Sequence, residues 1–230
     1  TADLTFDSTP EDDSGADVDD REYSLSDTET LRITSPELDK SIVSGSSSYG
    51  ETADPTLGIG ETITYELVAT IPEGTVDGVI LRDTLPAGME YVSSTVVRFG
   101  DDPNVLNNLS AAGPIPTMGT HAGGVTTYTI GDLTNLFDGE QTAEDEIVVR
   151  VTARVVEAGV DTSQTLTNTG SLEFVDGQGV AQTVTDTAEI EVVEPDMSIA
   201  KAVSPASADA GDIVSYTVTA TNDGDGPAYD

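Results

Sequence analysis

Hydrophobic and polar residues alternate along much of this chain, which is the pattern of strands that bury one face. The alternation is cleanest in Glu146-Ile-Val-Val-Arg-Val-Thr-Ala-Arg-Val-Val156, so we expect a central strand there with one half-solvated face. Runs rich in Val, Ile, Thr and Tyr, bounded by Gly, Pro, Asp and Asn, predict the other strands. The expected strands lie at 22–34, 37–43, 61–71, 77–83, 89–99, 125–131, 145–157, 165–175, 179–193, 197–203 and 212–222. No convincing helix is present, and the pattern predicts an all-β, Ig-like or Greek-key sandwich.

One sequence pattern occurs twice, around the only two lysines of the chain. Lys40 ends Pro36-Glu-Leu-Asp-Lys40 and is followed by Gly60-Glu-Thr-Ile-Thr-Tyr65. Lys201 ends Pro195-Asp-Met-Ser-Ile-Ala-Lys201 and is followed by Gly211-Asp-Ile-Val-Ser-Tyr216. In the same way, residues 1–6 and 27–33 match residues 169–174 and 186–192. Such self-similarity predicts an array of domains.

The repeats divide the chain into three parts. We expect the C-terminal strands of a preceding repeat at 1–35, a complete repeat at 36–194 and the first strands of a following repeat at 195–230. The fragment then belongs to a longer chain.

Composition and charge favour a folded surface protein. The hydrophobic share is 37%, which with 22 glycines lies in the ordinary globular range, so the chain can bury a core. The chain has no cysteine, and its net charge of −35 repels nucleic acid and anionic membranes. We expect an extracellular or cell-surface location and no membrane insertion by this fragment. Because no signal sequence opens the chain, we expect processing or truncation to have removed one.

The lysine at position 40 stands in a strand pattern with an apolar residue two positions before it. Leu38 and Lys40 therefore point to the same face, and that face is expected to be the core. The alternative is a surface lysine whose aliphatic stem covers apolar neighbours.

A family resemblance rests on the order of four motifs. They are Pro36-x-Leu-x-Lys40, Gly60-Glu-Thr-Ile-Thr-Tyr65, Val79-Ile-Leu-Arg-Asp83-Thr-Leu-Pro86-Ala-Gly88 and Leu166-Thr-Asn168-Thr-Gly170. Together they resemble the isopeptide-forming repeat domains of bacterial and archaeal cell-surface proteins, and they are similar to Gram-positive pilin and collagen-adhesin domains. The resemblance implies a spontaneous bond between a lysine amine and an asparagine side chain.

Carried over to this sequence, the resemblance implies that Lys40 is the nucleophile, Asn168 the acceptor and Asp83 the assisting acid. Burial would lower the pKa of the lysine, and a protonated carboxyl would polarise the amide. The reaction would occur once, with no cofactor, so the chain is not an enzyme in the usual sense. We expect the strands of Lys40 and Asn168 to be neighbours.

Two of these assignments have alternatives. Asp83 could instead accept backbone hydrogen bonds in the turn before Pro86. Asn107 and Asn108 are alternatives to Asn168 as the acceptor, although they lie in an irregular loop.

Acidic turns form a second class of candidate site. Their carboxylates suit calcium, but neither turn matches a complete calcium loop, and a hydrated, salt-adapted surface is the alternative. The candidate ligands are Asp12, Asp13, Asp17, Asp19, Asn222, Asp223 and Asp225. Asn222 precedes any expected Asp-x-Leu-Pro motif of its repeat and is not the acceptor for Lys201.

The function expected from these observations is structural: a subunit of an extracellular fibre or stalk. Its partners would be neighbouring repeats or identical chains, joined end to end or by strand addition. The alternative is an adhesin that binds a ligand through the irregular segment at 100–124. A hydrolase is disfavoured because the only histidine, His121, is expected to be a solvated loop residue.

Overall fold

The computed structural model describes residues 2–7, 22–27, 34–46, 55–100, 108–137, 139, 142–157 and 164–228. The chain forms two compact units, Thr1–Thr34 and Ser35–Asp230. In the first unit, β1 (Ala2–Asp7) and β2 (Glu22–Asp27) form an antiparallel pair.

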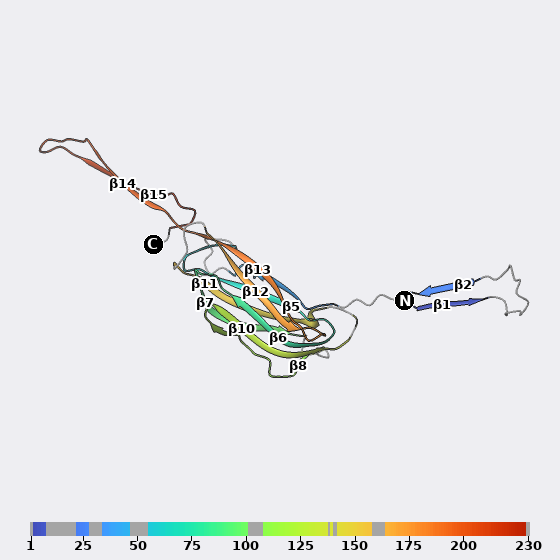
Figure 1. Ribbon diagram of the computed structural model, residues 1–230. Helices are drawn as coiled ribbons and strands as arrows, with labels where there is room; N and C mark the ends of the chain where they lie inside the picture. The colour runs from blue at the N-terminus through green and yellow to red at the C-terminus, as the bar shows by residue number, and fades with distance from the viewer. Residues whose placement is uncertain are drawn as a thin grey trace, which may run out of the picture. The chain divides into compact units, whose positions relative to one another are not determined.

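The second unit contains a sandwich of two sheets that lie face to face (Figure 1). The four-stranded sheet has the order β3 (Glu37–Ile42), β5 (Thr62–Thr70), β11 (Glu146–Val155) and β7 (Met89–Phe99). The seven-stranded sheet has the order β4 (Thr56–Gly58), β13 (Ala181–Val193), β12 (Gln164–Val175), β6 (Gly74–Thr84), β10 (Val125–Asn135) and β8 (Leu109–Ala111), and β9 (Thr120–Ala122) also pairs with β10. The all-β sandwich expected from the sequence is therefore confirmed.

Strand β11 is central in its sheet, as its alternation predicted. It pairs antiparallel with β5 on one side and β7 on the other. Its apolar residues Ile147, Val149 and Val151 are fully buried, whereas Arg150 between them is partly exposed. The single helical turn among the described residues is the three-residue 3-10 turn Ala143–Asp145, which Thr142 and Asp145 cap reciprocally.

The core consists of two apolar clusters between the sheets. The larger includes Leu67, Leu81, Val149 and Leu172, and the smaller includes Ile63, Leu85, Leu166 and Ile190. Both clusters draw residues from both sheets, so they hold the two layers together.

The segment at 100–124 is only partly the irregular connection that its sequence predicts. Residues 101–107 lie outside the described part of the chain. Beyond them, β8 and β9 each add three residues to the edge of the seven-stranded sheet through β10. Three-residue strands carry too little periodicity to be recognised in sequence.

The last two strands, β14 (Met197–Ser204) and β15 (Ser215–Asn222), form a separate antiparallel hairpin. Its register repeats that of β3 and β5. Lys201 faces Val218 and Val203 faces Tyr216, as Lys40 faces Leu67 and Ile42 faces Tyr65. The backbone thus reproduces the duplication seen in the sequence. The assignment of residues 195–230 to a following repeat stays a prediction.

Candidate functional site: a buried lysine, aspartate and asparagine

Three polar side chains from three strands meet between the sheets. Lys40 comes from β3, Asp83 from the end of β6 and Asn168 from β12. Lys40 is 5% exposed, and Asp83 and Asn168 are 0% exposed. A surface position for Lys40 is thereby excluded.

Asp83 and Asn168 each stand between apolar neighbours that belong to different core clusters. In β12, Asn168 lies between Leu166 of the smaller cluster and Leu172 of the larger cluster. In β6 and the turn after it, Asp83 lies between Leu81 and Leu85 in the same way. Asp83 and Asn168 therefore lie where the two apolar clusters approach each other.

The carboxylate of Asp83 joins the other two side chains. Lys40 Nζ donates a hydrogen bond to Asp83 Oδ2 and forms an ion pair with it. Asn168 Nδ2 donates to both carboxylate oxygens of Asp83, at 3.3 and 3.2 Å. Lys40 Nζ also lies 4.9 Å from the ring centroid of Tyr65. Asp83 thus contacts both expected reaction partners. The alternative was that its carboxylate accepts backbone hydrogen bonds in the turn before Pro86.

The amide of Asn168 is oriented with its nitrogen toward Asp83. Its oxygen, Asn168 Oδ1, is buried and has no hydrogen-bond partner in the structure. Polarisation of the carbonyl by Asp83 requires the opposite orientation, which a half turn of the amide about its Cβ–Cγ bond supplies. A proton on Asp83 would then give this oxygen its missing donor.

Burial dominates the electrostatics of Lys40. Desolvation lowers the pKa of its ammonium group from the usual 10.5, and the neighbouring charges of Asp83 and Asp186 only partly oppose this. Burial, with a smaller contribution from Asp83, raises the pKa of the Tyr65 hydroxyl, which therefore stays neutral. The site thus favours a neutral amine on Lys40 more than an exposed position would.

The strands that carry Lys40 and Asn168 are neighbours, as expected, but they are in contact between the sheets and are not hydrogen-bonded partners within one sheet. β3 belongs to the four-stranded sheet and β12 to the seven-stranded sheet, and the two residues meet across the interior of the sandwich. Alternation of polar and apolar residues gives the face of a strand but not its partner, so the sequence did not say whether the two strands share a sheet.

Gly170, which was not among the predicted site residues, lies against the side chain of Lys40. A Cβ at this position would lie 2.9 Å from Leu67 Cδ2 and 3.2 Å from Lys40 Cδ. The absence of a side chain therefore makes room for the stem of Lys40. The signal was present in the spacing of Asn168 and Gly170, which places both residues on the same face of β12.

The other asparagines and His121 lie elsewhere. Asn107 is outside the described residues, and Asn108 donates from Nδ2 to Glu144 Oε2 at 3.0 Å. His121 is not a solvated loop residue. It lies in β9, its ring stacks on Tyr91 at 4.3 Å, and Nδ1 is 3.0 Å from Thr126 Oγ1. This stack joins β9 of one sheet to β7 of the other.

The candidate calcium ligands remain a prediction. Asp12, Asp13, Asp17 and Asp19 lie outside the described residues. Near the other turn, the side-chain oxygen of Asn222 accepts from the backbone N–H groups of Asp196 and Gly224, and its Nδ2 donates to Gly226 O. Asp223 and Asp225 follow Asn222 in this turn. Within the described ranges, no group of three or more His, Cys, Asp or Glu side chains is placed to hold a metal ion.

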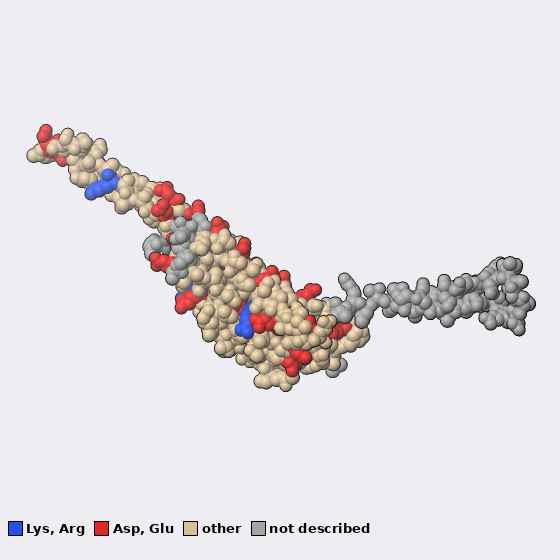
Figure 2. Space-filling model, viewed as in Figure 1, with Lys and Arg blue, Asp and Glu red and all other residues tan. Residues whose placement is uncertain are grey.

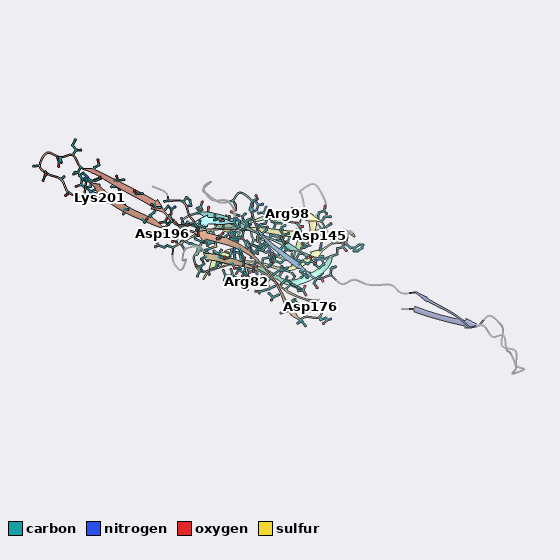
Figure 3. The ribbon with its side chains drawn as sticks, turned by 90° about the horizontal axis from the view of Figure 1, so that it is seen from above. Arg82, Arg98, Asp145, Asp176, Asp196 and Lys201 are labelled. Carbon is teal, nitrogen blue, oxygen red and sulfur yellow. The ribbon has the colours of Figure 1, made fainter. Side chains whose placement is uncertain are left out.

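Lys201 repeats one contact of Lys40. Its Nζ lies 4.6 Å from the ring centroid of Tyr216, as that of Lys40 lies over Tyr65. Lys201 lies on β14 of the hairpin (Figure 3) and is exposed, together with the apolar Ile199 two residues before it. The buried environment of Lys40 is therefore not reproduced at this lysine.

Acidic side chains are spread over the visible face of the sandwich, and basic ones are few (Figure 2). Among the described residues, arginines of this unit form the cross-strand ion pairs Arg82–Glu173, Arg98–Glu146, Arg150–Glu66 and Arg154–Glu90. Partly exposed pairs of this kind contribute little stability. In the described part of the chain, no helix is long and apolar enough to cross a membrane.

Comparisons with known proteins give similar folds at low sequence identity. No protein-family model and no curated protein matches the chain. Similar solved structures include BcpA, the major pilin subunit of Bacillus cereus, with 18% identity and a TM-score of 0.43 over 80% of this chain and 52% of that chain. Another is the 35 kDa C-terminal fragment of the major pilin GBS80 of Streptococcus agalactiae, with 14% identity and a TM-score of 0.42 over 72% of this chain and 58% of that one.

A third similar structure is ACE19, the collagen binding subdomain of the Enterococcus faecalis surface protein ACE. It has 12% identity and a TM-score of 0.36, and the match covers 59% of this chain and 92% of that one. The chain therefore spans only 52% of BcpA and 58% of the GBS80 fragment but nearly all of ACE19. The likeness concerns the strand arrangement, and no functional residue is transferred from it.

Proposed function

We propose that this chain is part of an extracellular fibre or stalk whose sandwich domain closes itself with a covalent bond between Lys40 and Asn168. One observation carries the proposal: a single buried carboxylate, that of Asp83, contacts both the amine of Lys40 and the amide of Asn168. The repeated sequence pattern and the lack of cysteine support a tandem array that is stabilised by another cross-link.

The chemistry requires only the groups of the site. Within the ion pair, a proton moves from Lys40 Nζ to Asp83, which leaves a neutral amine and a protonated carboxyl. The amide of Asn168 turns so that its oxygen accepts from Asp83, and Nζ attacks Cγ. The new Nζ–Cγ bond forms as the Cγ–Nδ2 bond breaks, and Asp83 carries a proton from Nζ to Nδ2, which leaves as ammonia. No oxidant, reductant or cofactor is consumed.

The position of the bond explains its mechanical use. It would join β3 of one sheet to β12 of the other, as an inter-sheet disulfide does in other sandwiches. Tension applied at the two ends of the sandwich would pass from residue 40 directly to residue 168. The segment between these residues, which includes most strands of both sheets, would carry no load.

Single-molecule extension tests the proposal. Pulled from handles outside residues 37 and 193, the wild-type chain is expected to release no length from the 127 residues between Lys40 and Asn168. The Lys40→Ala variant is expected to release this segment, on the order of 45 nm at the full reach of an extended chain. Equal contour lengths for the two chains would contradict the proposal.

An adhesin is the second candidate. The segment after residue 111 exposes two apolar side chains, Ile115 at 43% and Met118 at 63%. A host protein or glycan that binds the wild-type chain but not an Ile115→Ser/Met118→Ser variant would support this function. Binding that is unaffected by the two substitutions would remove this surface from consideration.

A further inference from the structure

A row of paired residues crosses three strands of the seven-stranded sheet beneath Lys40. Gly170 of β12 pairs with Asp83 of β6 on one side and with Asp186 of β13 on the other. Residues that pair directly across antiparallel strands point to the same face. Asp83 and Asp186 therefore face the four-stranded sheet from either side of Gly170, and Lys40 lies over the gap between them.

The two aspartates contact opposite ends of the same lysine. Asp83 accepts from the side-chain amine of Lys40, whereas Asp186 Oδ2 accepts from its backbone N–H at 2.7 Å. The other oxygen of Asp186 accepts from the backbone N–H of Thr187 at 2.9 Å, which fixes the orientation of the carboxylate. The facing sheet thus binds Lys40 at two points, with Asp186 at its backbone N–H and Asp83 at its amine.

The hydrogen bond from the backbone N–H of Lys40 to Asp186 is significant because β3 is an edge strand. Among the strands that the structure describes, β3 pairs only with β5, so no described strand lies at its outer edge to accept backbone N–H groups. Asp186 supplies such an acceptor from the other sheet. Without it, the backbone of β3 would lose this hydrogen bond to the facing sheet, and the position of the Lys40 amine would be less well defined.

We propose that Asp186 is a positioning residue for the cross-link: it fixes the backbone of Lys40 against β13 so that the amine meets Asp83 and Asn168. The inference rests on the proposed function. The sequence supports it independently, because the matching segment at 27–33 begins with the same Asp-Thr pair, at Asp27, while all five of its next residues differ.

Asp186 also bears a charge that faces the reacting pair. The titratable groups around Lys40 are Asp83, Asp186 and the neutral Tyr65, and the negative charge of Asp186 raises the pKa of Lys40 against the effect of burial. The reactive form holds one proton on the Lys40–Asp83 pair, so the rate is expected to have a bell-shaped pH profile. Removal of the charge at position 186 should move the alkaline limb of this profile to lower pH.

The experiment separates the hydrogen bond from the charge. The full 230-residue chain is taken from inclusion bodies in urea, refolded into buffers of different pH, quenched in acid at set times and weighed by mass spectrometry. The variants are Asp186→Ala, which removes both features, and Asp186→Asn, which keeps an acceptor oxygen without the charge. The control is Asp176→Ala. Asp176 accepts from the backbone of Gln178 and Val180 at the turn between β12 and β13 (Figure 3) but does not touch Lys40.

The expected result is a loss of ammonia about tenfold slower in Asp186→Ala than in the wild type, the size of effect that misplacement of a reacting group produces. Asp186→Asn should restore the rate near neutral pH and shift the alkaline limb downward, and Asp176→Ala should react as the wild type does. Equal rates for Asp186→Ala and the wild type, or equal slowing by Asp176→Ala, would overturn the inference. A wild-type chain that loses no ammonia would instead overturn the proposed function itself.

Discussion

Replacement of the acceptor, Asn168→Ala, is expected to destabilise the sandwich far more than loss of an ordinary buried asparagine. The bond would close a loop of 128 positions, from Lys40 to Asn168. By the loop-entropy relation used for disulfides, this closure contributes about 5 kcal/mol to the free energy of unfolding. At about 2–4 °C per kcal/mol for a domain of this size, the melting temperature should fall by about 10–20 °C.

The chain offers a matched control in Asn135. It is 2% exposed, and its Nδ2 donates at 2.8 Å to both Ile71 O and Asp145 Oδ1, so it also pairs a buried amide with a carboxylate. In the described part of the chain, Asp83 forms an ion pair with a lysine, whereas Asp145 does not. Asn135→Ala should therefore cost only about 1–3 kcal/mol, the penalty for broken buried hydrogen bonds.

Calorimetric melting of the three proteins tests this reasoning, with the intact mass of each sample measured in parallel. The melting temperature is expected to be highest for the wild type, lower for Asn135→Ala and lowest for Asn168→Ala. Equal losses in the two variants would show that Asn168 stabilises the fold through hydrogen bonds alone, and the covalent contribution worked out above would be refuted.

Three further predictions follow from the same structure. Gly170→Val should place a side chain against Leu67 and Lys40 and so destabilise the unreacted chain by about 1–3 kcal/mol. Part of the chain should then remain uncross-linked after refolding, and full mass loss at the wild-type rate would contradict this. His121→Ala should cost about 0.5–1.5 kcal/mol from its stack on Tyr91, measured by urea unfolding, whereas an unchanged midpoint would show that the stack contributes nothing. If the acidic surface responds only to charge screening, sodium chloride should restore any melting temperature lost on chelation, and a loss that only divalent ions reverse would indicate a defined calcium site.

Much of the fold was predictable from sequence because the long strands carry clear alternation. The central position of β11 and the burial of Lys40 beside Leu38 followed from that period of two. Which strands pair is set by contacts between distant segments, so the sequence did not reveal that Lys40 and Asn168 lie in different sheets. The three-residue strands β4, β8 and β9 are too short to show a period.

The site was predictable only in part, for a related reason. The residues of the proposed reaction stood out: Lys40 by the scarcity of lysine, and Asp83 and Asn168 by motif. Asp186 acts on a backbone N–H, and Gly170 acts by having no side chain, so neither presents a chemical group that sequence reasoning can single out. The stacking of His121 depends on a tertiary contact with Tyr91 that no local pattern encodes.

The central claim is tested most directly by the intact mass of the 230-residue chain under denaturing conditions. The wild-type mass is expected to lie one ammonia below that of the sequence, and proteolysis is expected to release a branched peptide that links Lys40 to Asn168. Lys40→Ala and Asn168→Ala should each show the full mass of their sequences, and Asp83→Ala should remain largely unreacted because the amide loses its polarising acid. A wild-type mass equal to that of the sequence would contradict the account and leave an ordinary sandwich with a buried ion pair.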